Sequence, residues 1–352
     1  MGSYVNKVVR VLVVDDSAYV RKVVKQMLSR SPFIEVVGTS RDGAEALEAI
    51  ETLNPDVVTL DLIMPEMDGV EFLREQMARR PIPVVIISIA SEGGEQVLAA
   101  LDAGAVDFLQ KPTALANEKI FEISNELIEK VKAASLVPLN RLPVMSDRPI
   151  QLSKVMPAFP SSGVVDLVAI GISTGGPQAL AFLIGQLPAD LPVPVAIVLH
   201  MPVGYTAMYA KRLNDMSLMK VVEASEGDVL EPGVVFIAPA GRHLTFVRHS
   251  DGTVRTHLDA RPFDTLHRPS VDVMFQSAAE VFGDRVLGVV MTGMGSDGTQ
   301  GAAWIKSRGG SIFTEAEETC IVYGMPRSVV EAGLSDCSVT LDSMAQAILD
   351  RL

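Results

Sequence analysis

The 352-residue sequence is poor in cysteine, in long apolar runs and in positive charge. Its two cysteines, Cys320 and Cys337, form neither a CxxC pair nor a disulfide framework, which indicates reduced thiols in a cytoplasmic protein. The 30 Lys and Arg residues stand against 43 Asp and Glu residues, so the chain lacks the clustered cations that nucleic-acid binding needs. No apolar run reaches the roughly 18 residues of a membrane span, and membrane insertion is therefore not expected.

Charge and proline divide the chain into three parts. A chain of 352 residues predicts about two domains, and residues 1–130 and 163–352 are both acidic. Between them, residues 131–162 carry five prolines and an excess of cations. We predict a first domain at 1–130, a basic proline-rich linker at 131–162 and a second domain at 163–352. Nothing in the sequence demands more than a monomer.

Both domains are predicted to be α/β, because apolar runs alternate with helical periodicity. Five strand–helix pairs in the first domain predict a flavodoxin-like, five-stranded parallel sheet. Its strands are expected at 8–14, 35–39, 57–60, 84–87 and 107–109. The second domain is predicted to be another doubly wound α/β domain, whose strand order one sequence does not reveal. Its strands are expected at 165–170, 193–199, 234–238 and 285–291, with helices at 177–187, 271–282 and 301–307.

Polar side chains follow the predicted strands of the first domain. Asp15 and Asp16 end the first strand and Asp61 ends the third, and these strands are neighbours in a doubly wound sheet. Three converging carboxylates need a cation, and hard oxygen ligands suit Mg²⁺. Ser88 and Lys111 end the next two strands, where they could bind an anionic oxygen. A single Asp is usually a helix cap, but the whole set indicates phosphoryl transfer onto a carboxylate.

The second domain contains the string GISTGGP at residues 171–177, between an apolar strand and a helix. Its G-x-S-x-G pattern matches a nucleophile elbow. The same glycine turn could instead cradle a phosphate at a helix N-terminus, or be a plain turn.

Two further polar residues follow apolar strands of the second domain. With Ser173, His200 and Asp297 supply a nucleophile, a base and a carboxylate that orients the base. Their chain order, Ser-His-Asp, differs from the Ser-Asp-His order of α/β-hydrolases and argues against that fold. Ser270 is expected either to cap the helix that follows it or to line the cleft, and His243 and His267 are expected to be surface or structural residues.

Residues 6–130 resemble a response-regulator receiver domain, on the strings VLVVDDS, LDLIMPEMDG and FLQKP. The resemblance implies that Asp61 is the phosphoacceptor, and that Ser88 and Lys111 contact the phosphoryl group. Phe108 matches the aromatic switch position. The implied Mg²⁺ ligands are Asp15, Asp16, Asp61 and the main-chain carbonyl of Ile63. Some receivers carry Glu where this chain has Ile63, so one carboxylate ligand option is missing.

Residues 164–350 resemble the catalytic domain of the chemotaxis protein-glutamate methylesterases, the CheB family. The matching strings are GISTGGP, LHMP, APAGRHL, HRPSVDVMF and MTGMGSDG. The resemblance implies that Ser173 is the nucleophile, His200 the general base and Asp297 its partner. It also implies main-chain oxyanion donors at Thr174 and Met294, and no cofactor in this domain.

Together the two resemblances imply a hydrolase that phosphorylation activates. Its expected substrates are methyl-accepting chemoreceptors, on which it would release methanol from glutamate methyl esters and deamidate glutamines. A chemotaxis histidine kinase would donate the phosphoryl group. Two rival functions are disfavoured. A nucleotide-binding domain would need GxGxxG or GK[ST], which the GISTGG string lacks, and a DNA-binding output domain would need a basic helix.

Overall fold

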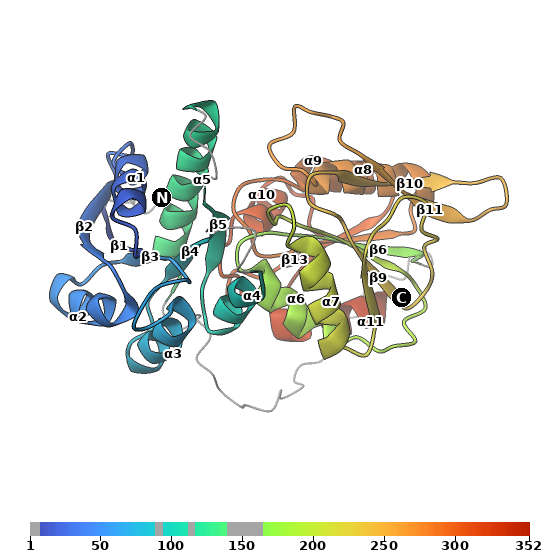
Figure 1. Cartoon of the computed structure of the whole chain (residues 1–352). Helices are drawn as coiled ribbons and strands as arrows, with labels where there is room; N and C mark the ends of the chain where they lie inside the picture. Colours follow the sequence, from blue (N-terminus) through green and yellow to red (C-terminus); the bar gives the residue numbers. More distant parts are fainter. Residues whose placement is uncertain (1–7, 89–93, 112–116, 139–164) are drawn as a thin grey trace. The chain divides into compact units, whose positions relative to one another are not determined.

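The computed structural model describes residues 8–88, 94–111, 117–138 and 165–352 (Figure 1). The chain separates into two compact units, Met1–Asp147 and Arg148–Leu352, and each is described by itself. Among the described residues, no helix combines the length and the apolar character that crossing a membrane requires.

The first unit is a five-stranded parallel sheet between two layers of helices. Its strands pair in the order β2-β1-β3-β4-β5, which confirms the predicted flavodoxin-like fold. The strands are β1 (Val9–Val14), β2 (Ile34–Ser40), β3 (Val57–Leu60), β4 (Val84–Ser88) and β5 (Asp107–Gln110). The inner strands β3 and β4 are buried along their whole length, as expected for a sheet covered on both faces.

The helices of the first unit divide between the two faces of its sheet. On one face α1 (Ala18–Leu28) packs beside α5 (Asn117–Ser135). On the other lie α2 (Gly43–Leu53), α3 (Gly69–Arg79) and α4 (Gly94–Asp102), as Figure 1 shows. Because α5 continues to Ser135, the first residues of the predicted linker belong to a helix. Most of that linker lies outside the described residues.

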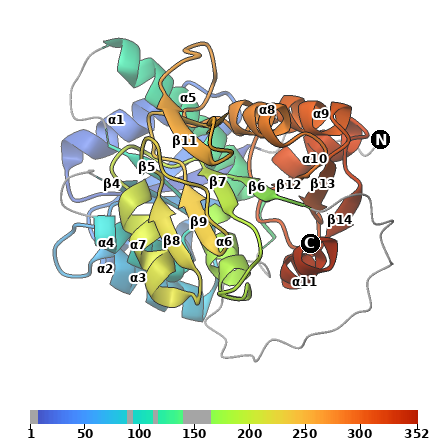
Figure 2. The same cartoon turned by 90° about the vertical axis from the view of Figure 1, so that its right-hand side faces the viewer.

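The second unit is built on a seven-stranded parallel sheet, with the order β14-β13-β12-β6-β7-β9-β8 (Figure 2). The strands are β6 (Leu167–Ile172), β7 (Val195–Leu199), β8 (Lys220–Glu223), β9 (Val234–Ile237), β12 (Val286–Val290), β13 (Ser311–Glu315) and β14 (Cys337–Val339). The first strand of this unit is β6. The next strand, β7, pairs with one side of β6, and β12, which comes later in the chain, pairs with the other side. The point where the order reverses therefore lies beside β6, which is where ligand sites of open α/β sheets form.

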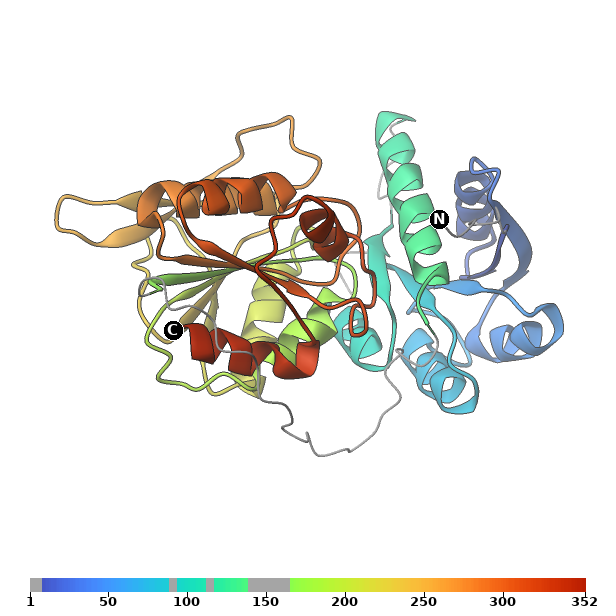
Figure 3. The same ribbon diagram turned by 180° about the vertical axis from the view of Figure 1, so that it is seen from behind.

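Helices cover both faces of the second sheet (Figure 3). One face carries α8 (Val271–Phe282), α9 (Thr299–Ser307) and α10 (Met325–Glu331), and the other carries α6 (Gly176–Ile184), α7 (Thr206–Met216) and α11 (Leu341–Arg351). A two-stranded hairpin of β10 (His243–Arg248) and β11 (Val254–Asp259) packs against α8. The predicted elements of this unit are present near their expected positions. The hairpin, α7, α10, α11, β8, β13 and β14 were not predicted.

Candidate active site and acidic pocket

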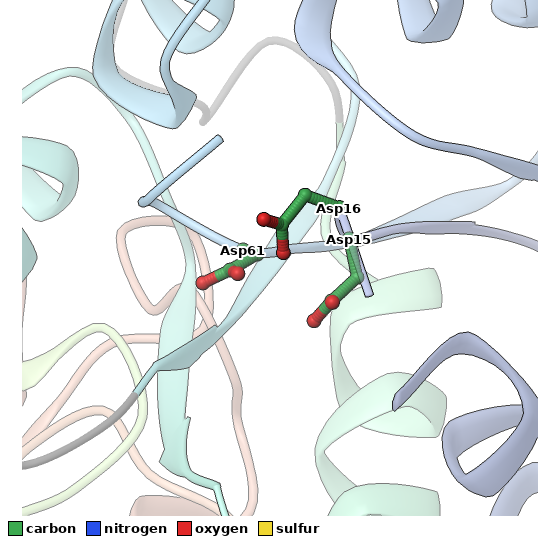
Figure 4. A group of neighbouring side chains, drawn as sticks. All are labelled: Asp15, Asp16 and Asp61. Carbon is green, nitrogen blue, oxygen red and sulfur yellow. The ribbon is translucent and has the colours of Figure 1, made fainter. Parts of the chain in front are cut away.

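The first unit brings three carboxylates together at the carboxyl end of its sheet. Asp15 and Asp16 follow β1 and Asp61 follows β3, and one oxygen of each lies within 4.8 Å of the others (Figure 4). Lys111, after β5, reaches into the same pocket. Its Nζ lies 2.6 Å from Asp61 Oδ2 and 2.8 Å from Asp15 Oδ2. The convergence expected from strand ends is therefore present.

Burial and charge oppose each other in this pocket. Burial raises the pKa of Asp15 more than the neighbouring ammonium of Lys111 lowers it, and the negative charge of Asp61 adds to the rise. Burial would lower the pKa of Lys111, but its hydrogen bonds to Asp15 and Asp61 outweigh this and raise it. Among the residues that the structure describes, the pocket thus holds one cation against three carboxylates. Oxygen donors with an exposed member, Asp16, form a set that suits Mg²⁺.

Three other residues implied by the receiver resemblance lie around this pocket. Ser88 ends β4, and its Oγ is buried with no hydrogen-bond partner among the described residues. An unpartnered buried hydroxyl is costly, which is consistent with a hydroxyl reserved for an incoming oxygen. Phe108 is buried in β5. Ile63 has a hydrocarbon side chain without a donor atom, so only its main-chain carbonyl could be a metal ligand.

In the second unit the three candidate catalytic residues follow three adjacent strands. Ser173 follows β6, His200 follows β7, and Asp297 lies in the loop after β12. The main-chain N–H of His200 donates to the Ile172 carbonyl over 3.1 Å, and the main-chain N–H of Ser173 donates to the Thr292 carbonyl over 3.0 Å. The main-chain ladder therefore fixes the three strand ends against one another at the point where the strand order reverses.

The loop after β12 lies directly against the serine. A Cβ added to Gly293 would lie 2.8 Å from Ser173 Cβ, so only glycine allows this approach. The Thr292 hydroxyl also donates to the Thr174 carbonyl over 3.0 Å. Met294 follows Gly293, so the two residues expected to supply oxyanion donors, Thr174 and Met294, flank Ser173 on adjacent loops.

His200 and Asp297 form a buried pair. The distance from His200 Nε2 to Asp297 Oδ2 is 2.8 Å, and their side chains are 8% and 10% exposed. The other ring nitrogen, Nδ1, is buried and has no hydrogen-bond partner among the described residues. An imidazole whose Nε2–H donates to a carboxylate keeps its lone pair on Nδ1. Nδ1 is therefore the atom that can accept a proton.

Asp297 accepts hydrogen bonds from four donors. Besides His200, these are the Ser270 hydroxyl at 2.9 Å, the Val271 N–H at 2.8 Å and the Asp272 N–H at 3.0 Å. Burial alone would raise the pKa of Asp297. The hydrogen bond and charge of His200 and the N–H groups at the start of α8 outweigh it and hold this pKa well below its usual range. Asp297 is thus a fixed anion, able to orient His200 and to stabilise its charged form.

Of the two roles expected for Ser270, the helix cap is wrong. Ser270 occupies the N-cap position of α8, but its hydroxyl makes no capping bond to the helix and donates instead to Asp297. The N–H groups at the helix start are capped by Asp297, which is remote in sequence. No local pattern could have revealed this, since the usual capping signal is a side chain next to the helix.

Two histidines that were expected to be surface or structural residues support the site. The His267 ring stacks on His200, with ring centroids 4.0 Å apart. His243 is fully buried, and its Nδ1 accepts the Ser270 N–H over 3.1 Å. Its Nε2 lies 3.1 Å from the Pro262 carbonyl and therefore carries the proton. Burial lowers the pKa of His243, which keeps it neutral and able to accept from Ser270.

Asp272, whose N–H donates to Asp297, caps in turn the helix that follows Asp297. Its Oδ1 accepts the Gly298 N–H at 2.9 Å and the Gly301 N–H at 2.7 Å, so it caps α9 while Asp297 caps α8. Burial raises the pKa of Asp272 to about 6, and the charge of Asp297 contributes to the rise. The folded state therefore binds more protons than the unfolded state between the usual pKa of 3.8 and about 6. Stability due to this group falls as pH rises through that window.

We expect Asp272→Asn to be more stable than the wild type above this window. The amide oxygen can accept from both glycine N–H groups, and no buried charge remains. The gain should be about 1 kcal/mol near neutral pH, allowing for solvent screening, and should vanish near pH 4. Urea unfolding at several pH values measures it. An identical pH dependence in both proteins would show that Asp272 is not the titrating group.

Comparison with known proteins agrees with this geometry. A family model described as CheB methylesterase matches residues 168–348, and one described as response regulator receiver domain matches residues 11–122. A Myxococcus xanthus protein named protein-glutamate methylesterase/protein-glutamine glutaminase 5 is 47% identical over 96% of each chain. A Geobacillus kaustophilus protein with the same name, unnumbered, is 45% identical over 97% of this chain and 98% of its own.

The second unit is similar to the catalytic domain of a CheB methylesterase among the solved structures. The crystal structure of the Thermotoga maritima CheB methylesterase catalytic domain is 38% identical, with a TM-score of 0.52. It covers 54% of this chain and is itself covered completely.

Proposed function

Because this chain belongs to the CheB methylesterase family, we propose that it is a phosphorylation-regulated hydrolase of chemotaxis adaptation that removes methyl esters from chemoreceptor glutamates. Its relatives are named protein-glutamate methylesterase/protein-glutamine glutaminase, and the same site would deamidate receptor glutamines. The observation that carries the proposal is the buried His200–Asp297 pair on the strand ends next to Ser173.

The proposed reaction begins when the Ser173 hydroxyl attacks the ester carbonyl. His200 Nδ1 takes the hydroxyl proton, and Asp297 stabilises the resulting imidazolium through Nε2. The developing negative charge on the carbonyl oxygen would be held by the main-chain N–H groups of Thr174 and Met294, each worth about 3 kcal/mol. His200 then gives its proton to the departing methoxy oxygen, and methanol leaves. Water, deprotonated by His200, releases the glutamate; with a glutamine substrate the first product is ammonia.

In the first unit, Asp61 would accept a phosphoryl group from a chemotaxis histidine kinase or a small phosphodonor. Asp15, Asp16, Asp61 and the Ile63 carbonyl would hold Mg²⁺, which when bound offsets the charge of the phosphoryl group. Lys111 would then pair with a phosphoryl oxygen, and Ser88 would donate its unused hydroxyl. Phe108 lies in β5, which pairs with the strand that Ser88 ends, and its ring would change orientation together with Ser88. The second domain needs no cofactor.

The domain organisation proposed from the sequence accompanies this function. Because α5 continues to Ser135, we assign residues 1–135 to the receiver, the following residues up to 162 to the linker and 163–352 to the catalytic domain, in a cytoplasmic monomer that binds no nucleic acid. The chemoreceptors and the kinase are its partners.

Methanol release from methylated receptor membranes tests the whole proposal. We expect release to rise when Mg²⁺ and a small phosphodonor are added. In Asp61→Asn this rise should be absent while basal release persists, because only the phosphoacceptor carboxylate has been removed. Asp56→Asn, an exchange of another receiver aspartate outside the pocket, is the control and should keep the stimulation. Equal stimulation of Asp61→Asn and the wild type would contradict the role of Asp61.

A further inference from the structure

The loops around the candidate active site present three strongly exposed apolar side chains. Val203 is 65% exposed, Phe263 is 68% and Leu266 is 90%. Among the described large apolar side chains of the second unit, only Leu218 is comparably exposed. We call Val203, Phe263 and Leu266 the apolar rim.

The apolar rim adjoins the catalytic histidine. Leu266 precedes His267, whose ring stacks on His200 at 4.0 Å, and Val203 lies three residues after His200. The two loops also meet through Gly241. Its N–H donates to the Arg268 carbonyl over 3.0 Å, and a Cβ added to it would lie 3.3 Å from Val203 Cγ2. The rim is therefore formed at the site by two loops in contact with a third.

The loop that carries Phe263 and Leu266 is braced. His243 binds the Pro262 carbonyl at one end of the loop and the Ser270 N–H at the other. Within the loop, the Arg268 guanidinium lies 5.1 Å from the Phe263 ring centroid and donates to the Phe263 carbonyl over 3.3 Å. Apolar side chains that a fixed loop holds in water do not contribute burial to the stability of the fold. Exposed apolar side chains of this kind mark interaction sites.

The charge around the rim indicates what it binds. The second domain is acidic overall, yet the loops of the rim carry Arg242, Arg261 and Arg268 against Asp259 and Asp264. One of these arginines, Arg261, is already paired with Asp259 at 2.8 Å. Arg242 and Arg268 then stand against Asp264, so these loops keep an excess of one positive charge, which is complementary to an acidic segment of a partner.

We propose that the apolar rim docks one face of an acidic amphipathic helix of the substrate protein, the helix that carries the target glutamate ester. This rests on the proposed esterase function. Side chains three and four residues apart share a helix face. When the target side chain enters the site, apolar side chains one turn away rest on Phe263, Leu266 and Val203. Acidic side chains beside them meet Arg242 and Arg268.

The test compares a large and a small substrate. The variant is Phe263→Ser combined with Leu266→Ser, and the matched control is Leu218→Ser, at an equally exposed apolar position at the end of α7. For methylated receptor membranes, we expect the KM of the rim variant to rise at least tenfold while kcat stays near the wild-type value. For a free N-acyl-glutamate γ-methyl ester, and for labelling of Ser173 by a small fluorophosphonate, the rim variant should match the wild type.

The outcomes separate the two proposals. If the wild type neither takes the fluorophosphonate at Ser173 nor hydrolyses the small ester, the esterase proposal fails. If those reactions proceed but the KM for receptor membranes is unchanged in the rim variant, or rises equally in Leu218→Ser, docking on the rim is wrong. A loss of small-ester turnover in the rim variant would also overturn it, because the residues would then act on the catalytic groups. Since all substituted side chains are exposed, the melting temperature should stay close to that of the wild type, with at most the small loss of the Phe263–Arg268 contact.

Discussion

The Ser173→Ala variant is expected to release no measurable methanol from methylated receptors. Without the hydroxyl, His200 Nδ1 has no nucleophile to activate, and the acyl-enzyme cannot form. Loss of the serine nucleophile in hydrolases with such a triad lowers kcat by on the order of 10⁶-fold. Both basal and phosphodonor-stimulated release should disappear, since both use the same serine. Gas chromatography of methanol from labelled receptor membranes measures the effect.

The matched control for this variant is Ser296→Ala. Ser296 is exposed, lies in the loop next to Asp297, and makes no side-chain bond to His200 or Asp297 among the described contacts. Its removal should leave release near the wild-type rate. The melting temperature of Ser173→Ala should also stay unchanged, because alanine fills the same space in a partly buried site. Methanol release by a folded Ser173→Ala protein would remove Ser173 from the mechanism.

The contacts that could be predicted from the sequence are those between residues at the ends of parallel strands. Parallel strands place their carboxyl ends on one edge, so a polar residue after each apolar run could be assigned to a common site. This brought Asp15, Asp61 and Lys111 together correctly, and it assigned Ser173 and His200 to the same edge of the second sheet, where the structure places them on adjacent strands. The order of the second sheet could not be obtained in this way, because strand pairing is a long-range choice that no single run of residues encodes.

The supporting residues were harder to predict than the candidate catalytic ones. His243 and His267 belong to no recognisable local motif, and their roles depend on contacts to loops far along the chain. Asp297 caps α8, the helix that contains Asp272, and Asp272 caps α9, the helix that follows Asp297, so neither residue matches the local capping signal. Glu315 shows the same limit. Glu315 is fully buried, and its carboxylate accepts the Thr292 N–H over 2.8 Å. It is the last residue of β13, a strand that begins and ends with polar residues and so escapes a search for apolar runs.

The Asp297→Asn variant is expected to have a kcat about 10⁴-fold below that of the wild type. In the wild type, Asp297 Oδ2 meets His200 Nε2 and the Val271 N–H, while its Oδ1 meets the Ser270 hydroxyl and the Asp272 N–H. Every side of the carboxylate faces a donor, so an amide must turn its NH₂ group toward one of them. If the NH₂ faces His200, it donates to Nε2 and moves the ring proton to Nδ1, which can then no longer accept from Ser173.

If the amide turns the other way, its NH₂ opposes the Asp272 N–H, and the start of α8 loses a cap worth about 1 kcal/mol. In either orientation the anion that stabilises the imidazolium is gone, so the main loss falls on kcat. Ser270→Ala is the control, because it removes one of the four donors and leaves both the charge and the His200 contact. We expect it to lower kcat by less than about tenfold, in line with one lost hydrogen bond. Asp297→Asn with activity within tenfold of the wild type would mean that His200 is oriented by its stacking on His267 rather than by the carboxylate.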